Sequence, residues 1–173
     1  MLAFLRRNIN DCPENVKATC YKTLVRPILE YGSAVWDPHH QVDIDNLEQI
    51  QKRAARFTTG NYTRETGNTK INMQKLKWKP LEERRAIIKL NLFYKCKMQL
   101  IDIHTNHLVL SKSCTRRGDR TYAIPTSNVD SHLFSFFPNS IRLWNAVPSA
   151  VKDSRSIDSF KSSLDEIILR SIY

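Results

Sequence analysis

LEERRAIIKLNLFYKCKMQLIDI, residues 81–103, carries apolar side chains at the spacing of an α-helix. One stripe along this helix consists of Ile87, Leu90, Tyr94, Met98 and Ile101. Ile88, Leu92 and Phe93 fall on its other sides. Because a helix that is apolar on several sides must be covered by other elements, we expect it to lie at the centre of a mainly α-helical bundle.

Two stretches before this central helix also predict helices. Residues 11–14, Asp-Cys-Pro-Glu, combine a capping side chain, a first-turn proline and an acid, which is typical of a helix start. The helix that follows must be kinked or interrupted at Pro27, which has no N–H and crowds the preceding turn. A second helix is predicted from an N-cap at Asp43 to about Gly60. Its inner face would consist of Ile44, Leu47, Ile50, Ala54 and Phe57.

The chain between these helices and the central one is polar. Residues 61–70 predict a loop, and a short helix is expected from about Thr69 to Trp78. Residues 111–120 are polar and basic, which indicates a surface loop. We therefore expect a helical domain over residues 1–110 and a smaller C-terminal segment over residues 111–173.

The C-terminal segment has a different pattern. Residues 121–125 and 133–137 are short, aromatic and β-branched, which favours a small β-hairpin. A short helix is predicted over residues 138–147, ending before Pro148. A final helix would begin after a cap at Ser156 and dock on the core. Its apolar stripe is Ile157, Phe160, Leu164, Ile167 and Ile168.

The charge of the chain is strongly positive, at +10 with five histidines counted as neutral. Residues 61–120 hold 14 Lys and Arg against 5 Asp and Glu, while the other two thirds are nearly balanced. A local excess of this kind is typical of a surface that contacts nucleic-acid phosphates without reading sequence. A solvated basic face with no ligand would give the same count.

The candidate nucleic-acid-binding residues form two groups. Around Trp78 and the start of the central helix stand Lys75, Lys77, Lys79, Arg84, Arg85 and Lys89. Trp78 itself could stack on a base or fill the junction between two helices, and the second interpretation is favoured. The other group is Arg53 and Arg56, near the end of the predicted helix over residues 43–60. Cations there also complement the helix dipole, so phosphate contact and a structural role are both open.

The sequence lacks the motifs of several enzyme classes. The chain has no Asp-Asp pair of the kind that holds Mg²⁺ in polymerases, no glycine-rich phosphate loop, no GxSxG and no HExxH. Neither the turn at residues 37–40, Asp-Pro-His-His, nor the set of Cys96, His104, His107 and Cys114 has the spacing of a common zinc site. We therefore expect no catalytic residue, metal or cofactor.

Membrane insertion and secretion are also not expected. No run of about 18 uncharged apolar residues occurs, and the apolar start MLAFL is shorter than a signal-peptide core. The four cysteines are scattered, which favours reduced thiols. The expected location is inside the cell, in the nucleus or the cytoplasm.

Four stretches together resemble a known family. They are CPENVKATCYKTLVRPILEYGSAVWDP (12–38), IDNLEQIQKRAARF (44–57), LKWKPLEERR (76–85) and SFFPNSIRLWNAVPSAVK (135–152). In this order they resemble the region after the polymerase palm in reverse transcriptases of LINE-type non-LTR retrotransposons, in the jockey-like and chicken-repeat-like groups. The resemblance extends from about Leu2 to Leu169.

The resemblance implies a thumb and post-thumb region that holds RNA or DNA through its backbone. The metal-binding aspartates of an RNA-directed DNA polymerase would belong to upstream domains, which would be partners of this region. No catalytic residue is carried over, because the matching motifs contain none. The alternatives are a helical protein-interaction module or an inert relic of a retroelement, and an apolar face left exposed near residues 1–31 would favour a severed domain.

Overall fold

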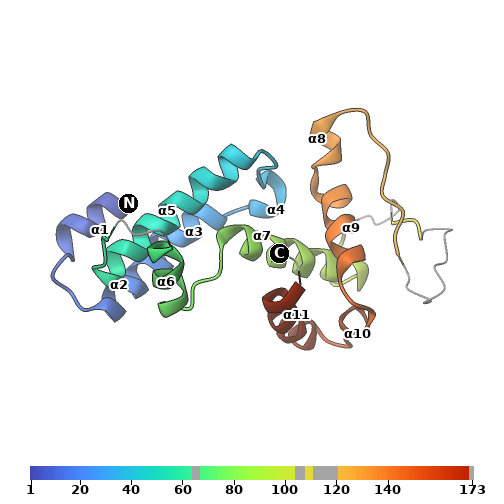
Figure 1. Cartoon of the computed structure of the whole chain (residues 1–173). Coiled ribbons are helices and arrows are strands. Elements are labelled where there is room, and N and C mark those ends of the chain that lie inside the picture. The colour runs from blue at the N-terminus through green and yellow to red at the C-terminus, as the bar shows by residue number, and fades with distance from the viewer. Residues whose placement is uncertain (64–66, 104–107, 111–120, 172–173) are drawn as a thin grey trace. The chain divides into compact units, whose positions relative to one another are not determined.

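The computed structural model describes residues 1–63, 67–103, 108–110 and 121–171, and for residues 167–171 it describes the backbone alone. The described chain is mainly helical, as predicted (Figure 1). The first elements are α1 (Leu2–Asn8), α2 (Glu14–Cys20), a π-helical segment η1 (Tyr21–Val25), α3 (Arg26–Glu30), α4 (Ser33–Trp36), α5 (Gln41–Thr59) and α6 (Asn68–Lys75). Then follow α7 (Leu81–Lys97), α8 (Asp130–Leu133), α9 (Phe136–Ala146), α10 (Ser149–Lys152) and α11 (Ile157–Ser171).

Two compact units make up the chain. The N-terminal unit comprises Met1–Ser33 and Asp37–Arg85, and the C-terminal unit comprises Ala34–Trp36 and the chain from Ala86 onward. The division thus falls inside α7, whereas the sequence placed a boundary at residue 111. That predicted boundary loop, residues 111–120, lies outside the described residues.

The N-terminal unit is built around α5, which packs against both α2 and α6. Its core consists of Leu5, Tyr21, Val25, Ala54, Ala55, Phe57 and Trp78. The inner face of α5 largely matches the prediction, since Ile44, Ala54 and Phe57 are buried. The helix begins at Gln41, two residues before the predicted cap at Asp43, and ends at Gly60, whose φ of +67° suits glycine.

The predicted interruption at Pro27 takes the form of the π-helical segment η1. Pro27 cannot donate a hydrogen bond to the carbonyl of Thr23, and its ring would crowd that carbonyl in a regular α-helix. The chain instead widens, and the N–H of Arg26 bonds to the carbonyl of Tyr21, five residues earlier. The helix α3 then resumes, with Pro27 in its first turn.

The C-terminal unit has an aromatic core. Its buried members are Leu90, Phe93, Tyr94, Ile141, Trp144, Val147, Val151, Phe160 and Leu164. The rings of Tyr94 and Phe160 stack with centroids 4.4 Å apart, which fixes α11 on the second half of α7. The backbone N–H of Ser159 bonds to Oγ of Ser156 over 3.2 Å, so the predicted cap of the final helix is present.

The predicted β-hairpin is wrong. Leu133 ends α8, and Phe136 and Phe137 begin α9, with a two-residue link between the helices. No β-strand occurs in the ranges that the structure describes. Only an isolated antiparallel bridge joins Tyr122 to Leu110. The helical start is possible because Pro138 falls in the first turn of α9, where its missing N–H leaves no bond unmade.

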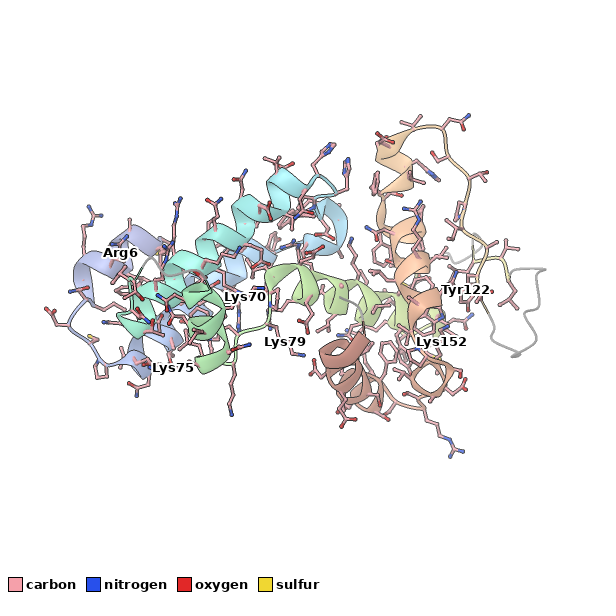
Figure 2. The ribbon with its side chains drawn as sticks, in the orientation of Figure 1. Arg6, Lys70, Lys75, Lys79, Tyr122 and Lys152 are labelled. Carbon is pink, nitrogen blue, oxygen red and sulfur yellow. The ribbon has the colours of Figure 1, made fainter. Side chains whose placement is uncertain are left out.

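The side chain of Asn145 makes the two backbone hydrogen bonds with Tyr122 that a neighbouring strand would make in a hairpin. The Asn145 amide accepts a hydrogen bond from the Tyr122 backbone N–H (3.0 Å) and donates one to its carbonyl (2.9 Å). The Nζ of Lys152 donates to the backbone carbonyl of Asn145 over 3.2 Å, and Figure 2 labels Tyr122 and Lys152. The extended segment is thereby fastened to α9 without a sheet.

Candidate nucleic-acid interface

The outer face of α5 carries a compact group of cations near its C-terminal end. Lys52 and Arg53 are exposed and Arg56 is half-buried, because the core-facing positions of these turns are Gln51, Ala54 and Ala55. None of the three cations makes an ion pair or hydrogen bond with a described residue. Two of the predicted binding residues, Arg53 and Arg56, therefore present uncompensated charge at the surface. We call Lys52, Arg53 and Arg56 the α5 basic face.

Lys75, Lys77 and Lys79 also lie at the surface, where α6 ends. The Nζ of Lys75 is 2.6 Å from Oε2 of Glu14, and that of Lys79 is 3.6 Å from Oε1 of Glu83. The exposed pair of Lys75 is weak and leaves this lysine able to meet a phosphate. Lys79 is half-buried and Glu83 is buried, so Lys79 is less accessible to a ligand. Figure 2 shows Lys70 and Lys75 projecting from α6.

Arg84, Arg85 and Lys89 are placed differently. The Arg84 guanidinium donates to both oxygens of the Glu30 carboxylate, from Nε and Nη2. The Nε of Arg85 donates to Oδ1 of Asp37 over 2.5 Å. The Arg85 side chain is 1% exposed, and Lys89 is buried as well. These contacts fasten the first turns of α7 within the N-terminal unit, and a phosphate would have to displace a carboxylate to reach either arginine.

Glu30 lies in a cluster with two arginines, Arg26 and Arg84. Arg26 lies 4.0 Å from the same carboxylate, so two guanidinium groups share one acid. Burial and the neighbouring charge of Arg84 lower the pKa of Arg26, and Glu30 opposes this. The cluster is therefore a structural ion-pair network in which both arginines are held by Glu30, although two guanidinium groups against one carboxylate leave one positive charge.

Trp78 belongs to the core. Its ring stacks on Tyr21 and is 7% exposed, so it is not available to stack on a base. Burial raises the pKa of the Tyr21 hydroxyl above its ordinary value, because the phenolate would lose water. Of the two interpretations open from the sequence, the junction between helices is the one that the structure shows.

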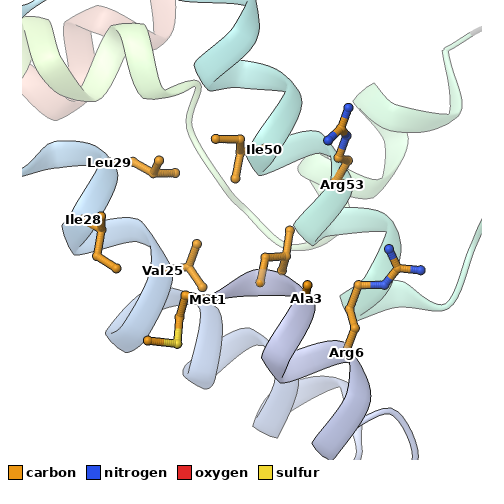
Figure 3. Close-up of a pocket in the computed structure, with 9 residues that line it drawn as sticks. Met1, Ala3, Arg6, Val25, Ile28, Leu29, Ile50 and Arg53 are labelled. Carbon is orange, nitrogen blue, oxygen red and sulfur yellow. The ribbon is translucent and has the colours of Figure 1, made fainter.

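Sequence reasoning missed the contribution of α1. Arg6 and Arg53 line one pocket together with the apolar side chains of α1, η1, α3 and α5 (Figure 3). Arg6 is exposed and has no ion pair or hydrogen bond with a described side chain. The basic run Arg6-Arg7 in the last turn of α1 was the available signal.

The described residues contain no group of three or more His, Cys, Asp or Glu side chains that could hold a metal ion. His104, His107 and Cys114 lie outside them. No helix within the described ranges is long and apolar enough to cross a bilayer. Comparison with protein-family models, with curated proteins and with solved structures finds no significant match to this chain.

Proposed function

We propose that this chain binds the phosphate backbone of RNA or DNA as the thumb and post-thumb region of a LINE-type RNA-directed DNA polymerase, and that it does not polymerise by itself. The observation that carries the binding proposal is the α5 basic face. Lys52, Arg53 and Arg56 lie together on two consecutive turns, and none of them makes an ion pair with a described acid. The family assignment rests on the four sequence stretches alone.

Phosphate binding at such a face is driven by counterion release. Each neutralised phosphate frees condensed cations, so affinity falls steeply with salt and depends little on sequence. Lys75 and Lys77 would extend the contact, since exposed lysines can exchange an acidic partner for a phosphate. The half-buried Lys79 would stay beside Glu83. Arg84 and Arg85 would act indirectly, by holding the first turns of α7 in place, and the buried Lys89 would not reach a phosphate.

Binding of fluorescein-labelled single-stranded RNA and duplex DNA, followed by anisotropy at about 50 and 200 mM salt, tests the proposal. The double variant Lys52→Glu/Arg56→Glu should weaken binding and reduce the salt slope on duplex DNA by about 2, since two phosphate contacts are lost. The control is Arg155→Glu/Lys161→Glu, which reverses two exposed charges in the C-terminal unit. Binding that is absent, indifferent to salt, or equally weakened in both variants would refute it.

A protein-interaction module is the second candidate. Several apolar side chains of residues 1–31 are exposed, among them Met1 (60%), Phe4 (53%), Ile28 (61%) and Tyr31 (85%). Exposed apolar side chains in this part of the chain support a surface that packs on another protein. A monomeric, soluble protein with no affinity for other proteins would count against this candidate.

A further inference from the structure

The N-terminal unit contains an apolar pocket of about 420 Å³ between α1, the η1–α3 helix and α5 (Figure 3). Its walls are the aliphatic side chains of Leu2, Val25, Ile28, Leu29 and Ile50, with Met1 and Ala3. Ile28 remains 61% exposed and Met1 60% exposed although both line it. The pocket is therefore an open groove, suited to a side chain that projects from another surface.

One end of this groove carries positive charge from arginine side chains. Among the described residues, Arg6 of α1 and Arg53 of α5 are the charged side chains that line it, and in Figure 3 both extend from neighbouring helices on the same side of the pocket. Neither makes an ion pair or hydrogen bond with a described residue. A second hollow beside it is lined by Ala3, Arg6, Arg7 and Asn10, which adds another cation at the same end.

We propose that this groove binds an acidic segment of a partner protein, with an aliphatic anchor of that segment in the apolar pocket and its carboxylates on Arg6 and Arg53. A guanidinium matches the two oxygens of a carboxylate with two parallel hydrogen bonds, and an apolar anchor beside such a pair is typical of grooves that bind amphipathic helices. The inference does not depend on the proposed nucleic-acid function.

The residues that line the groove favour an acidic protein segment over a nucleobase, an acyl chain or a second copy of this chain. Among the described residues, no aromatic side chain lines the pocket for a nucleobase to stack on, and the aliphatic walls offer no hydrogen bond to the polar edge of a base. An acyl chain needs enclosure, which the exposed Ile28 and Met1 do not give. A second copy of this chain carries a charge of +10 and would bring more cations to the arginines.

The probe is a fluorescein-labelled helical peptide of about 14 residues, four turns, with leucines along one face and glutamates beside them. The full chain should bind it, and Arg6→Glu/Arg53→Glu should weaken binding at least about tenfold. Ile28→Asp, at an exposed position that can change without unfolding the core, should weaken it similarly. A peptide with lysine in place of glutamate should not bind, and Lys22→Glu, an exposed change outside the groove, should leave affinity within about twofold.

Several results would overturn the inference. Equal binding of the lysine and glutamate peptides, or unchanged peptide affinity in both groove variants, would show that the groove does not recognise an acidic segment. A dimer in sedimentation that Ile28→Asp abolishes would show that a second copy occupies the groove. Loss of RNA binding in Ile28→Asp would show that nucleic acid occupies it. The Lys52→Ala/Arg56→Ala variant separates the two proposals, because it removes two phosphate contacts without adding carboxylates beside Arg53, and should therefore weaken nucleic-acid binding and keep the peptide. Peptide binding without RNA binding in the unmodified chain supports the groove while refuting the nucleic-acid proposal.

Discussion

The ring of Trp78 stacks on that of Tyr21, with centroids 4.5 Å apart and an interplanar angle of 21°. This contact joins η1 to the link between α6 and α7. Gln51 of α5 connects the same two segments, since its Oε1 accepts from the Tyr21 hydroxyl over 3.0 Å and its Nε2 donates to the Lys79 carbonyl over 2.8 Å. One ring stack and one buried amide therefore both connect η1 to the link between α6 and α7.

Gln51→Leu should destabilise the protein by about 2–3 kcal/mol. The Tyr21 hydroxyl and the Lys79 carbonyl would each lose a hydrogen bond in a place that water does not reach easily. Urea denaturation measures the loss as a lower midpoint with the same slope. Gln49→Leu, exposed on the opposite side of α5, is the matched control, and an equal loss there would show that the bridge is not the cause.

Asp37→Asn should cost about 3–5 kcal/mol of unfolding free energy. The change removes the charge that compensates Arg85, whose side chain is 1% exposed, and an unpaired buried guanidinium is strongly unfavourable. Thermal and urea unfolding give the magnitude. The control is Asp153→Asn, at an exposed position. If both variants unfold alike, Arg85 does not need Asp37.

Glu82→Gln should stabilise the protein near pH 7 and have little effect near about pH 4, below the ordinary titration of glutamate. Burial raises the pKa of Glu82, and the attraction of Arg85 offsets this only in part. A raised pKa means that ionisation is harder in the folded state, so stability falls as pH rises from the ordinary pKa to the raised one. The amide has no proton to lose and avoids that fall.

The pH dependence is measured as the difference in urea midpoint between variant and parent at several pH values. Glu166→Gln, which is exposed on α11, serves as the control. A Glu82→Gln effect that is constant across the pH range, or destabilising at neutral pH, would contradict the assigned burial cost.

Gln99→Gly should raise the stability by up to about 1 kcal/mol. Gln99 has a φ of +53°, a conformation that costs side-chain-bearing residues roughly 1–2 kcal/mol, and glycine adopts it freely. It follows α7 in a C-terminal turn where the N–H of Leu100 bonds to the carbonyl of Lys95 over 2.9 Å. Gln49→Gly within α5 should instead lose about 1 kcal/mol, and differential scanning calorimetry compares the two. Destabilisation in both would refute the conformational argument.

The helices could be predicted because their signals are local. The stripe of α7, the cap of α11 at Ser156 and the end of α5 at Gly60 all depend on neighbours within one or two turns. The hairpin failed for the opposite reason. The backbone of Tyr122 bonds to the side chain of Asn145, 23 residues away, beside its isolated bridge to Leu110, and β-propensity does not indicate such a side-chain contact.

The candidate site shows the same limit. Counting charges along the chain placed the basic excess at residues 61–120, yet three of its cations meet acids far upstream. Lys75 pairs with Glu14, Arg84 with Glu30 and Arg85 with Asp37, at separations of 61, 54 and 48 residues. A local count cannot include such compensation. The uncompensated face on α5 lies in a stretch whose total charge is nearly neutral.

The π-helical segment η1 has a consequence for how this chain tolerates changes in length. A π-turn holds one residue more than an α-turn, so η1 accommodates an extra residue while α2 and α3 keep their faces toward the core. The extra residue of the π-turn compensates for Pro27, because the wider turn relieves the clash that the proline ring would cause in a regular α-helix. Related chains should therefore show a one-residue deletion at this point together with loss of the proline, and neither change alone.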